Sequence, residues 1–166
     1  RIVGFKVDTI ANFGAYMSLF SSAVPTYLYA TLLSGQYDIA NIHCNVRAVY
    51  TNTVPVDAYR GAGRPEACYL VERIMETAAR ELGVDPADLR RKNFIREFPH
   101  QTPVIMAYDA GDFEANLDQA REAADVAGFA ARKAESEARG KLRGLGYSSY
   151  IEACGIAPSA AVGSLG

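Results

Sequence analysis

The chain has 166 residues, of which 49% are hydrophobic and 22% are charged, and its net charge is −2. This length and composition fit one globular domain with a buried core, and the negative charge argues against a nucleic-acid binder that works by neutralising phosphates. No apolar run approaches the ~20 residues that cross a bilayer, and we expect no membrane span and no signal peptide.

The few cysteines and histidines do not form a recognisable metal or disulfide pattern. Cys44, Cys68 and Cys154 are odd in number and far apart, which is typical of reduced thiols in a cytoplasmic protein. His43 and His100 have no partner at a ligand spacing. We therefore expect no protein-bound metal site in this chain.

Two segments near the N-terminus have the alternation of half-buried strands. Apolar side chains alternate with polar ones or glycine in Ile2–Ile10, and Ile39–Thr53 repeats the pattern. Between them, the apolar segment Pro25–Leu33 is closed by Ser34 and Gly35, which predicts a short helix.

The stretch Val54–Glu66, VPVDAYRGAGRPE, joins the second strand to the next helix. Gly61 and Gly63 permit a positive φ and a close approach of the backbone, and Pro65 favours a helix start. The free N–H groups and the positive end of such a helix can bind an anion. The alternative is a turn that only connects two elements, and the local pattern taken alone favours it.

The most regular helix is predicted over Pro65–Leu82, with apolar residues at every fourth position from Leu70 to Leu82, Val71 and Met75 beside them, and a stop at Gly83. Glu72 and Glu76 are expected on other, more polar positions of this helix.

A second helix is predicted to start at Asp85 and Pro86. The basic run Arg90–Lys92 lies near its end, where cations are favoured. We interpret this run as a solvated helix end first, and as a partner patch only second.

The C-terminal third is more polar and less regular. The loop Phe98–Gly111 is the one break that suggests a boundary inside the chain. Asp112 is expected to cap a helix that runs to about Ala127, where Gly128 interrupts it. A surface helix is expected to follow at 129–139, and a strand at 142–151. Separated strands and helix pairs predict an α+β fold.

Several motifs together resemble one protein family. The runs NTVPVDAYRGAGRPEA and AARELGVDPADLRRKNFI, together with ANFGAY, PTYLYATLLSGQYDI, YDAGDFEANLDQA and RGLGYSSYIEACG, resemble, in the same order, the molybdenum-binding large subunit of the xanthine dehydrogenase, aldehyde oxidase and carbon monoxide dehydrogenase family. The likeness covers essentially the whole chain. It implies that residues 1–166 are a single internal segment of a longer, elongated molybdopterin-binding subunit.

The resemblance implies an oxidoreductase that oxidises an aldehyde or an N-heterocycle with water-derived oxygen. It implies a molybdopterin cofactor, with or without a cytosine dinucleotide, and electron transfer to iron–sulfur clusters and FAD. Those groups belong to an iron–sulfur small subunit and an FAD medium subunit, in a dimer of heterotrimers. The catalytic glutamate belongs to a motif beyond Gly166, and neither Glu66 nor Glu152 matches it, so we expect no catalytic residue here and no activity of the isolated segment.

The site residues implied by the resemblance are few. Arg60 matches the arginine whose backbone amide contacts the ligands of the metal centre, and Gly61 and Ala62 occupy the turn that faces it. Copper-containing carbon monoxide dehydrogenases have a cysteine at the position of Gly61. Purine hydroxylases have a phenylalanine at that of Ala62 and an arginine at that of Leu28. The resemblance therefore implies an open, apolar substrate pocket at Leu28 and Ala62 that suits neither CO nor a purine.

Two functions of different classes remain open from the sequence. One is a segment of a molybdenum hydroxylase catalytic subunit. The other is a structural or interaction domain that keeps the fold without the cofactor.

Overall fold

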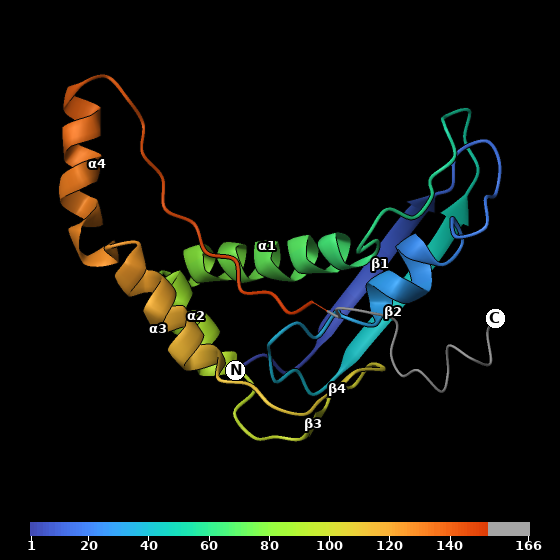
Figure 1. The fold of residues 1–166 in the computed structure, drawn as a ribbon, viewed down its shortest axis with the longest axis horizontal. Helices are drawn as coiled ribbons and strands as arrows, with labels where there is room; N and C mark the ends of the chain where they lie inside the picture. The colour runs from blue at the N-terminus through green and yellow to red at the C-terminus, as the bar shows by residue number, and fades with distance from the viewer. Residues whose placement is uncertain (153–166) are drawn as a thin grey trace.

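The computed structural model describes residues 1–152, which form an elongated α+β arrangement (Figure 1). Two strands lie at one end, the long helix α1 (Arg64–Leu82) starts beside them, and α4 (Phe129–Ala138) lies at the opposite end. The predicted fold class is confirmed by this mixture of helices and few strands.

The two N-terminal strands pair with each other in parallel. β1 (Phe5–Asn12) and β2 (Ile42–Val49) run in register from Phe5 opposite Ile42 to Asn12 opposite Val49. β2 lies inside its predicted segment, whereas β1 runs two residues beyond the predicted end at Ile10. The inward side chains of β1 include Val7 and Ala11, which are buried. His43 is exposed, as its polar position in the alternation predicts.

The predicted helix between the strands is only partly regular. It begins as the π-helical turn η1 (Val24–Leu28), continues helically to Ala30, and then becomes a series of turns up to Gln36. Gly35 has a φ of +55° at this end. The buried side chains of Tyr29, Leu32 and Leu33 pack with Val7 and Ala67 into a core between the strands and α1.

Helix α1 has the predicted ends but buries a different face. Gly83 adopts the left-handed conformation after its last residue, which confirms the predicted stop. The buried apolar side chains are Ala67, Val71, Met75 and Ala79. Ile74 and Leu82, predicted on the apolar face, are 49% and 66% exposed. The buried stripe therefore runs through Val71 and Met75, which were predicted beside the apolar row, rather than through Ile74 and Leu82.

A second core joins α1 to two further helices. α2 (Pro86–Asn93) is capped by Asp85, whose side chain accepts from the amides of Ala87 and Asp88, and α3 (Phe113–Ala123) is capped by Asp112. Both caps confirm the sequence prediction. The ring of Phe94 stacks on Tyr37 and meets Phe113 edge to face. This core comprises the following buried residues: Tyr37, Ile39, Val71, Met75, Ala87, Phe94 and Leu117.

The loop 98–111 contains a small antiparallel pair, β3 (His100–Gln101) and β4 (Ala107–Tyr108). α3 ends four residues before the predicted Ala127, and the short 3-10 helix η2 (Val126–Gly128) leads from it into α4. The predicted interruption is therefore present, but it begins before Gly128.

The predicted strand at 142–151 is wrong. The segment has no strand partner in the described part of the chain and returns from α4 along α1 as irregular backbone. Its backbone groups bond to side chains instead. Gln36 Nε2 donates to the carbonyl of Tyr150 over 2.8 Å, and the amide of Ser149 donates to Glu72 Oε2 over 2.7 Å.

Within residues 1–152, no helix has the length and apolar character needed to cross a membrane. Cys44 and Cys68 are free thiols, and Cys154 lies outside the described residues.

Candidate functional site

The chain from Tyr59 to Arg64 folds into two consecutive turns. The amide of Ala62 donates to the carbonyl of Tyr59 over 2.8 Å, and the amide of Arg64 donates to the carbonyl of Gly61 over 3.2 Å. The third residue of each turn is a glycine, Gly61 with φ +85° and Gly63 with φ +89°. A turn with a negative φ at its second residue and a positive φ at its third is type II, which favours glycine at the third position. The spacing G-A-G therefore encodes this double turn.

The second glycine also fixes where the double turn lies. Gly63 is buried and precedes the first residue of α1. A Cβ at Gly63 would lie 2.7 Å from Leu28 Cβ and 2.8 Å from the backbone nitrogen of Tyr29. Only glycine permits this approach. The contact places Leu28 of η1 against the double turn. Two parts of the site predicted from the sequence, Leu28 and residues 60–62, therefore lie close together.

The first glycine faces open space. A Cβ at Gly61 would have no atom within 4 Å, and Arg60 beside it is exposed. Within residues 1–152, no protein group bonds to the amides of Arg60 or Gly61. Unpaired amides beside a glycine form a donor surface that suits a polar or anionic ligand.

This donor surface fits a cofactor that brings its own metal ligands. In the described part of the chain, no three His, Cys, Asp or Glu side chains are placed to hold a metal ion. A metal at the double turn would therefore be held through atoms of a cofactor or through residues outside 1–152. The free amides and the absent side chain at Gly61 are compatible with the first of these.

Arg64 is the last residue of the double turn and the first residue of α1. Its Nε is buried without a hydrogen-bond partner in the described residues, while Glu152 Oε1 lies 3.7 Å away as an ion pair. Glu66 lies in the first turn of α1 and is exposed. Within residues 1–152 Glu66 makes no ion pair, whereas Glu152 pairs with Arg64.

A buried ionic cluster joins α1 and α2. Arg90 is fully buried, and its Nε donates to Glu72 Oε2 over 3.0 Å. Its Nη1 donates to Glu76 Oε2 over 3.3 Å, and the hydroxyl of Tyr37 donates to Glu72 Oε1. The interpretation of residues 90–92 as a solvated helix end is thus wrong for Arg90, because α2 folds back so that this side chain points at α1.

The raised pKa values of Tyr37 and Arg90 keep both groups protonated in this cluster. Burial, followed by the Glu72 carboxylate, raises the pKa of Tyr37 far above its ordinary value, so the hydroxyl remains a donor. Burial alone would lower the pKa of Arg90, but the charges of Glu72 and its neighbours outweigh burial and the net shift is upward. Arg90 therefore stays charged.

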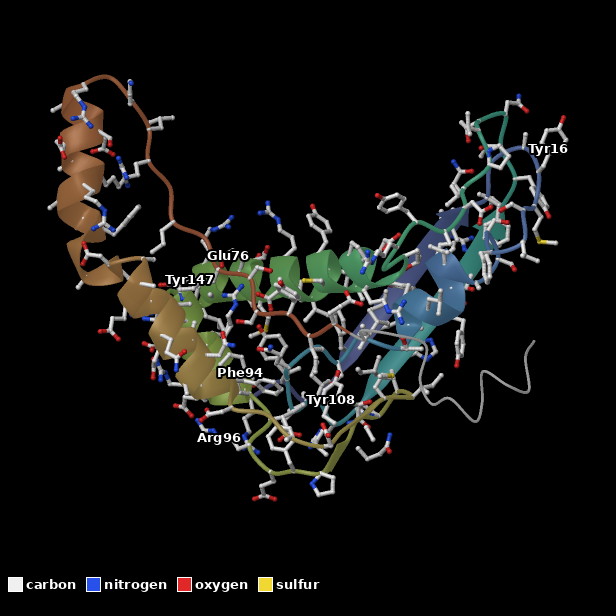
Figure 2. The ribbon with its side chains drawn as sticks, viewed as in Figure 1. Tyr16, Glu76, Phe94, Arg96, Tyr108 and Tyr147 are labelled. Carbon is white, nitrogen blue, oxygen red and sulfur yellow. The ribbon has the colours of Figure 1, made fainter. Side chains whose placement is uncertain are left out.

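This cluster also holds the returning segment in place. Arg90 Nη2 donates to the carbonyl of Tyr147 over 3.2 Å, and Glu72 accepts from the amide of Ser149. The guanidinium carbon of Arg90 lies 5.8 Å from the centre of the Tyr147 ring. Figure 2 shows Tyr147, which belongs to this segment, near Glu76 of α1, and both residues line the same hollow. The contacts bring Glu152 to the double turn, because only two residues separate it from Ser149.

The first comparison with known proteins concerns this region. The model of the molybdopterin cofactor-binding domain matches residues 1–94, more than half of the chain, and these residues include η1 and the double turn. The chain belongs to this family. The resemblance to molybdenum-binding large subunits is thereby confirmed.

Individual relatives agree with this membership. The carbon monoxide dehydrogenase large chain of Hydrogenophaga pseudoflava is 38% identical, over 96% of this chain and 21% of the relative. The nicotine 6-hydroxylase large subunit of Paenarthrobacter nicotinovorans is 33% identical, over 93% of this chain and 19% of the relative. The chain spans about a fifth of the length of both relatives.

A solved structure with a similar fold is quinoline 2-oxidoreductase from Pseudomonas putida 86. It superposes with a TM-score of 0.71 and 29% identity, over 79% of this chain and 17% of that one. The described fold is therefore that of a molybdenum hydroxylase segment.

The structure brings the predicted site residues together. Arg60, Gly61 and Ala62 form the outer part of the double turn, and Leu28 packs against its base. Sequence reasoning missed Arg64 and Arg90. A signal for Arg90 was available, since Glu72 and Glu76 lie four apart on α1 and can both face one cation from the next helix.

Proposed function

We propose that this chain forms one wall of the molybdopterin site in the large subunit of a molybdenum hydroxylase. The amides of Arg60 and Gly61 bind the cofactor end that carries the metal, and the missing side chain of Gly61 leaves room for it. When bound, this cofactor supplies the oxidising centre that adds water-derived oxygen to an aldehyde or an N-heterocycle.

The observation that carries this proposal is the double turn with two unpaired amides and open space at Gly61, in a chain of the molybdopterin cofactor-binding domain family. Type II turns fix both amides before a ligand arrives, so binding costs little further ordering. The N-terminus of α1 follows immediately and favours negative charge at this end.

We place the substrate beside Leu28 and Ala62. Both are partly exposed, and Leu28 packs against the base of the double turn, so a ligand in contact with Ala62 lies within reach of Leu28. Neither side chain donates a hydrogen bond or carries a charge. Such a surface selects a substrate by its apolar shape rather than by its charge. Relatives named for nicotine and quinoline support the N-heterocycle as the preferred substrate class.

The remaining parts of the proposed enzyme lie outside this chain. We propose that the full-length subunit works with an iron–sulfur subunit and an FAD subunit, in the cytoplasm, as a dimer of heterotrimers. The naming of relatives as large chains and large subunits supports a multi-subunit complex.

The proposal predicts where the cofactor is found. The purified full-length subunit should contain molybdenum and a pterin in equal amounts, whereas the 166-residue chain should contain neither. One turn of amides provides charge-assisted hydrogen bonds worth about 1.5–3 kcal/mol each, too few for tight binding without the other walls. Elemental analysis and pterin fluorescence measure both. A full-length subunit without either group would instead favour a structural domain that has lost the cofactor.

The composition of the pocket predicts the substrate preference of the full-length complex. Aromatic N-heterocycles and aldehydes should be oxidised with a higher kcat/KM than xanthine, and CO should not be oxidised. Leu28 provides no charge for a purine, and Gly61 provides no thiolate in the turn. Steady-state assays with a dye acceptor test this. A higher kcat/KM for xanthine than for every other compound, or turnover of CO, would contradict the assignment of this pocket.

A further inference from the structure

Arg64 contacts the double turn through both its backbone and its side chain. Its amide closes the second turn at the carbonyl of Gly61, and its Nη1 donates to the carbonyl of Ala62 over 3.5 Å. The Ala62 carbonyl belongs to the central peptide of the second turn. Type I and type II turns differ mainly by a flip of this peptide. The contact with Arg64 therefore favours the type II form over the flipped one.

The guanidinium of Arg64 needs a counter-charge in this position. Only 17% of the side chain is exposed, and its Nε has no hydrogen-bond partner within residues 1–152. A largely buried charge is costly unless an opposite charge accompanies it. Glu152 is that opposite charge, since its Oε1 lies 3.7 Å from Nε. Without Glu152, the guanidinium would be better solvated if it turned into water and left Ala62.

Glu152 follows a segment that is anchored at several points. Side-chain groups bond to the backbone of residues 147, 149 and 150. Ile151, directly before Glu152, packs against the core between the strands and α1. A carboxylate that follows such residues has little freedom left to lose when it pairs. The returning segment thus connects the buried ionic cluster to Arg64 and the double turn.

We propose that Arg64 and Glu152 are positioning residues for the proposed cofactor site, and that their ion pair holds the double turn in its type II form. The inference rests on the proposed function, since this turn is the part of the chain that is proposed to bind the cofactor. The first turn is closed by the amide of Ala62, whose carbonyl Arg64 contacts. A flip at this residue would therefore disturb the turn that carries the unpaired amides of Arg60 and Gly61.

This role affects the site more than the stability of the whole chain. Ion pairs with a partly exposed partner contribute little to the free energy of unfolding. A flip of one peptide is a local event, and local events appear in the exchange of the amides concerned. Amides that must be ordered when a ligand arrives bind it less tightly than amides that are fixed beforehand. Loss of the ion pair should therefore weaken cofactor retention while the fold persists.

Hydrogen exchange of the full-length subunit, produced without molybdenum, tests the effect on the turn. In Arg64→Met and in Glu152→Gln, the amide of Ala62 should exchange at least about tenfold faster than in the unmodified subunit. Arg91→Met is the matched control, because Arg91 pairs with carboxylates of α3 and lies on α2, away from the start of α1 (Figure 1). It should leave the exchange of Ala62 unchanged. Unchanged exchange in Arg64→Met or in Glu152→Gln would overturn the proposal.

The molybdenum and pterin content of the subunit produced with molybdenum tests the effect on the cofactor. Both should fall at least about threefold in Arg64→Met and in Glu152→Gln. The double variant should hold no less than Arg64→Met, because Glu152 acts through Arg64. Arg64→Lys keeps a cation that can pair with Glu152, and it should restore most of the content and the slow exchange of Ala62. Normal content in both single variants, additive losses in the double variant, or a lysine no better than methionine would overturn the proposal.

These outcomes separate this inference from the proposed function. An unmodified full-length subunit without molybdenum and pterin would refute the proposed function, whereas faster exchange of Ala62 in the two variants would still support the restraint of the turn by the ion pair. Normal molybdenum and unchanged exchange in every variant would retain the proposed function and refute the positioning role.

Discussion

Replacement of Arg90 by methionine is expected to destabilise the folded chain by about 3–5 kcal/mol, since removing one partner of a buried ion pair leaves the other charge uncompensated. Methionine keeps most of the apolar stem, so the loss is due to charge and hydrogen bonds. Glu72 would lose the partner of its Oε2, and the carbonyl of Tyr147 would lose its donor. Urea unfolding, followed by circular dichroism, measures the free energy of unfolding.

The neighbouring Arg91 provides a matched control on the same helix. It also pairs with carboxylates, at 2.6 Å from Asp118 and 3.3 Å from Glu114, but these groups lie at the surface. Arg91→Met should therefore cost under about 1 kcal/mol. Equal losses for both variants would show that the Arg90 cluster is no more important than a surface ion pair.

Replacement of Gly63 by alanine is the second change with a large expected effect, about 2–5 kcal/mol of unfolding free energy. A positive φ costs a residue with a Cβ about 1–2 kcal/mol. The new Cβ would also overlap Leu28 Cβ and the backbone of Tyr29, and overpacking costs a further 1–3 kcal/mol, roughly. Backbone atoms cannot move aside as the end of a flexible side chain can.

Gly61→Ala separates these two terms. Gly61 has nearly the same φ as Gly63, but its Cβ would meet nothing within 4 Å. We expect it to lose only the conformational part, about 1–2 kcal/mol. If both alanine variants were equally stable in thermal and urea unfolding, the close packing of η1 on the double turn would be disproved.

The features predicted correctly from the sequence depend on neighbours in the chain. Asp85 caps α2 through amides two and three residues away, and Gly83 ends α1 by its own conformation. The double turn is encoded in the same way, because each type II turn needs a glycine within a four-residue window. Local chemistry of this kind can be recognised without knowledge of the fold.

The features missed depend on residues far apart in the chain. Arg90 is buried because Glu72, eighteen positions earlier on another helix, faces it. Residues 142–151 have the composition of a strand, but a strand also needs a ladder partner. Here the backbone of this segment bonds instead to side-chain atoms of Glu72, Arg90 and Gln36. Sequence alternation predicts extended backbone and says nothing about its partner.

The candidate site shows the same division. That Gly61 lies in a tight turn was predicted, whereas the contact of Gly63 with Leu28 is a long-range feature that only the structure shows. The alternation of Ile2–Ile10 and Ile39–Thr53 predicted two strands but not that they are parallel neighbours, because the 29 residues between β1 and β2 allow several pairings.

Molybdenum content of the full-length subunit with Gly61→Val is the most direct test of the central claim, that the double turn binds the cofactor. Gly140→Val is the matched control: Gly140 has a φ of +68°, has open space beside it, and lies at the end of α4 remote from the double turn (Figure 1). Both valines cost similar backbone strain, but only the one at 61 occupies the space beside the free amides. We expect molybdenum occupancy to fall at least about tenfold in Gly61→Val, because its branched side chain overpacks the space that the cofactor needs, and to stay normal in Gly140→Val. Normal molybdenum and pterin content in a folded Gly61→Val subunit would contradict the account.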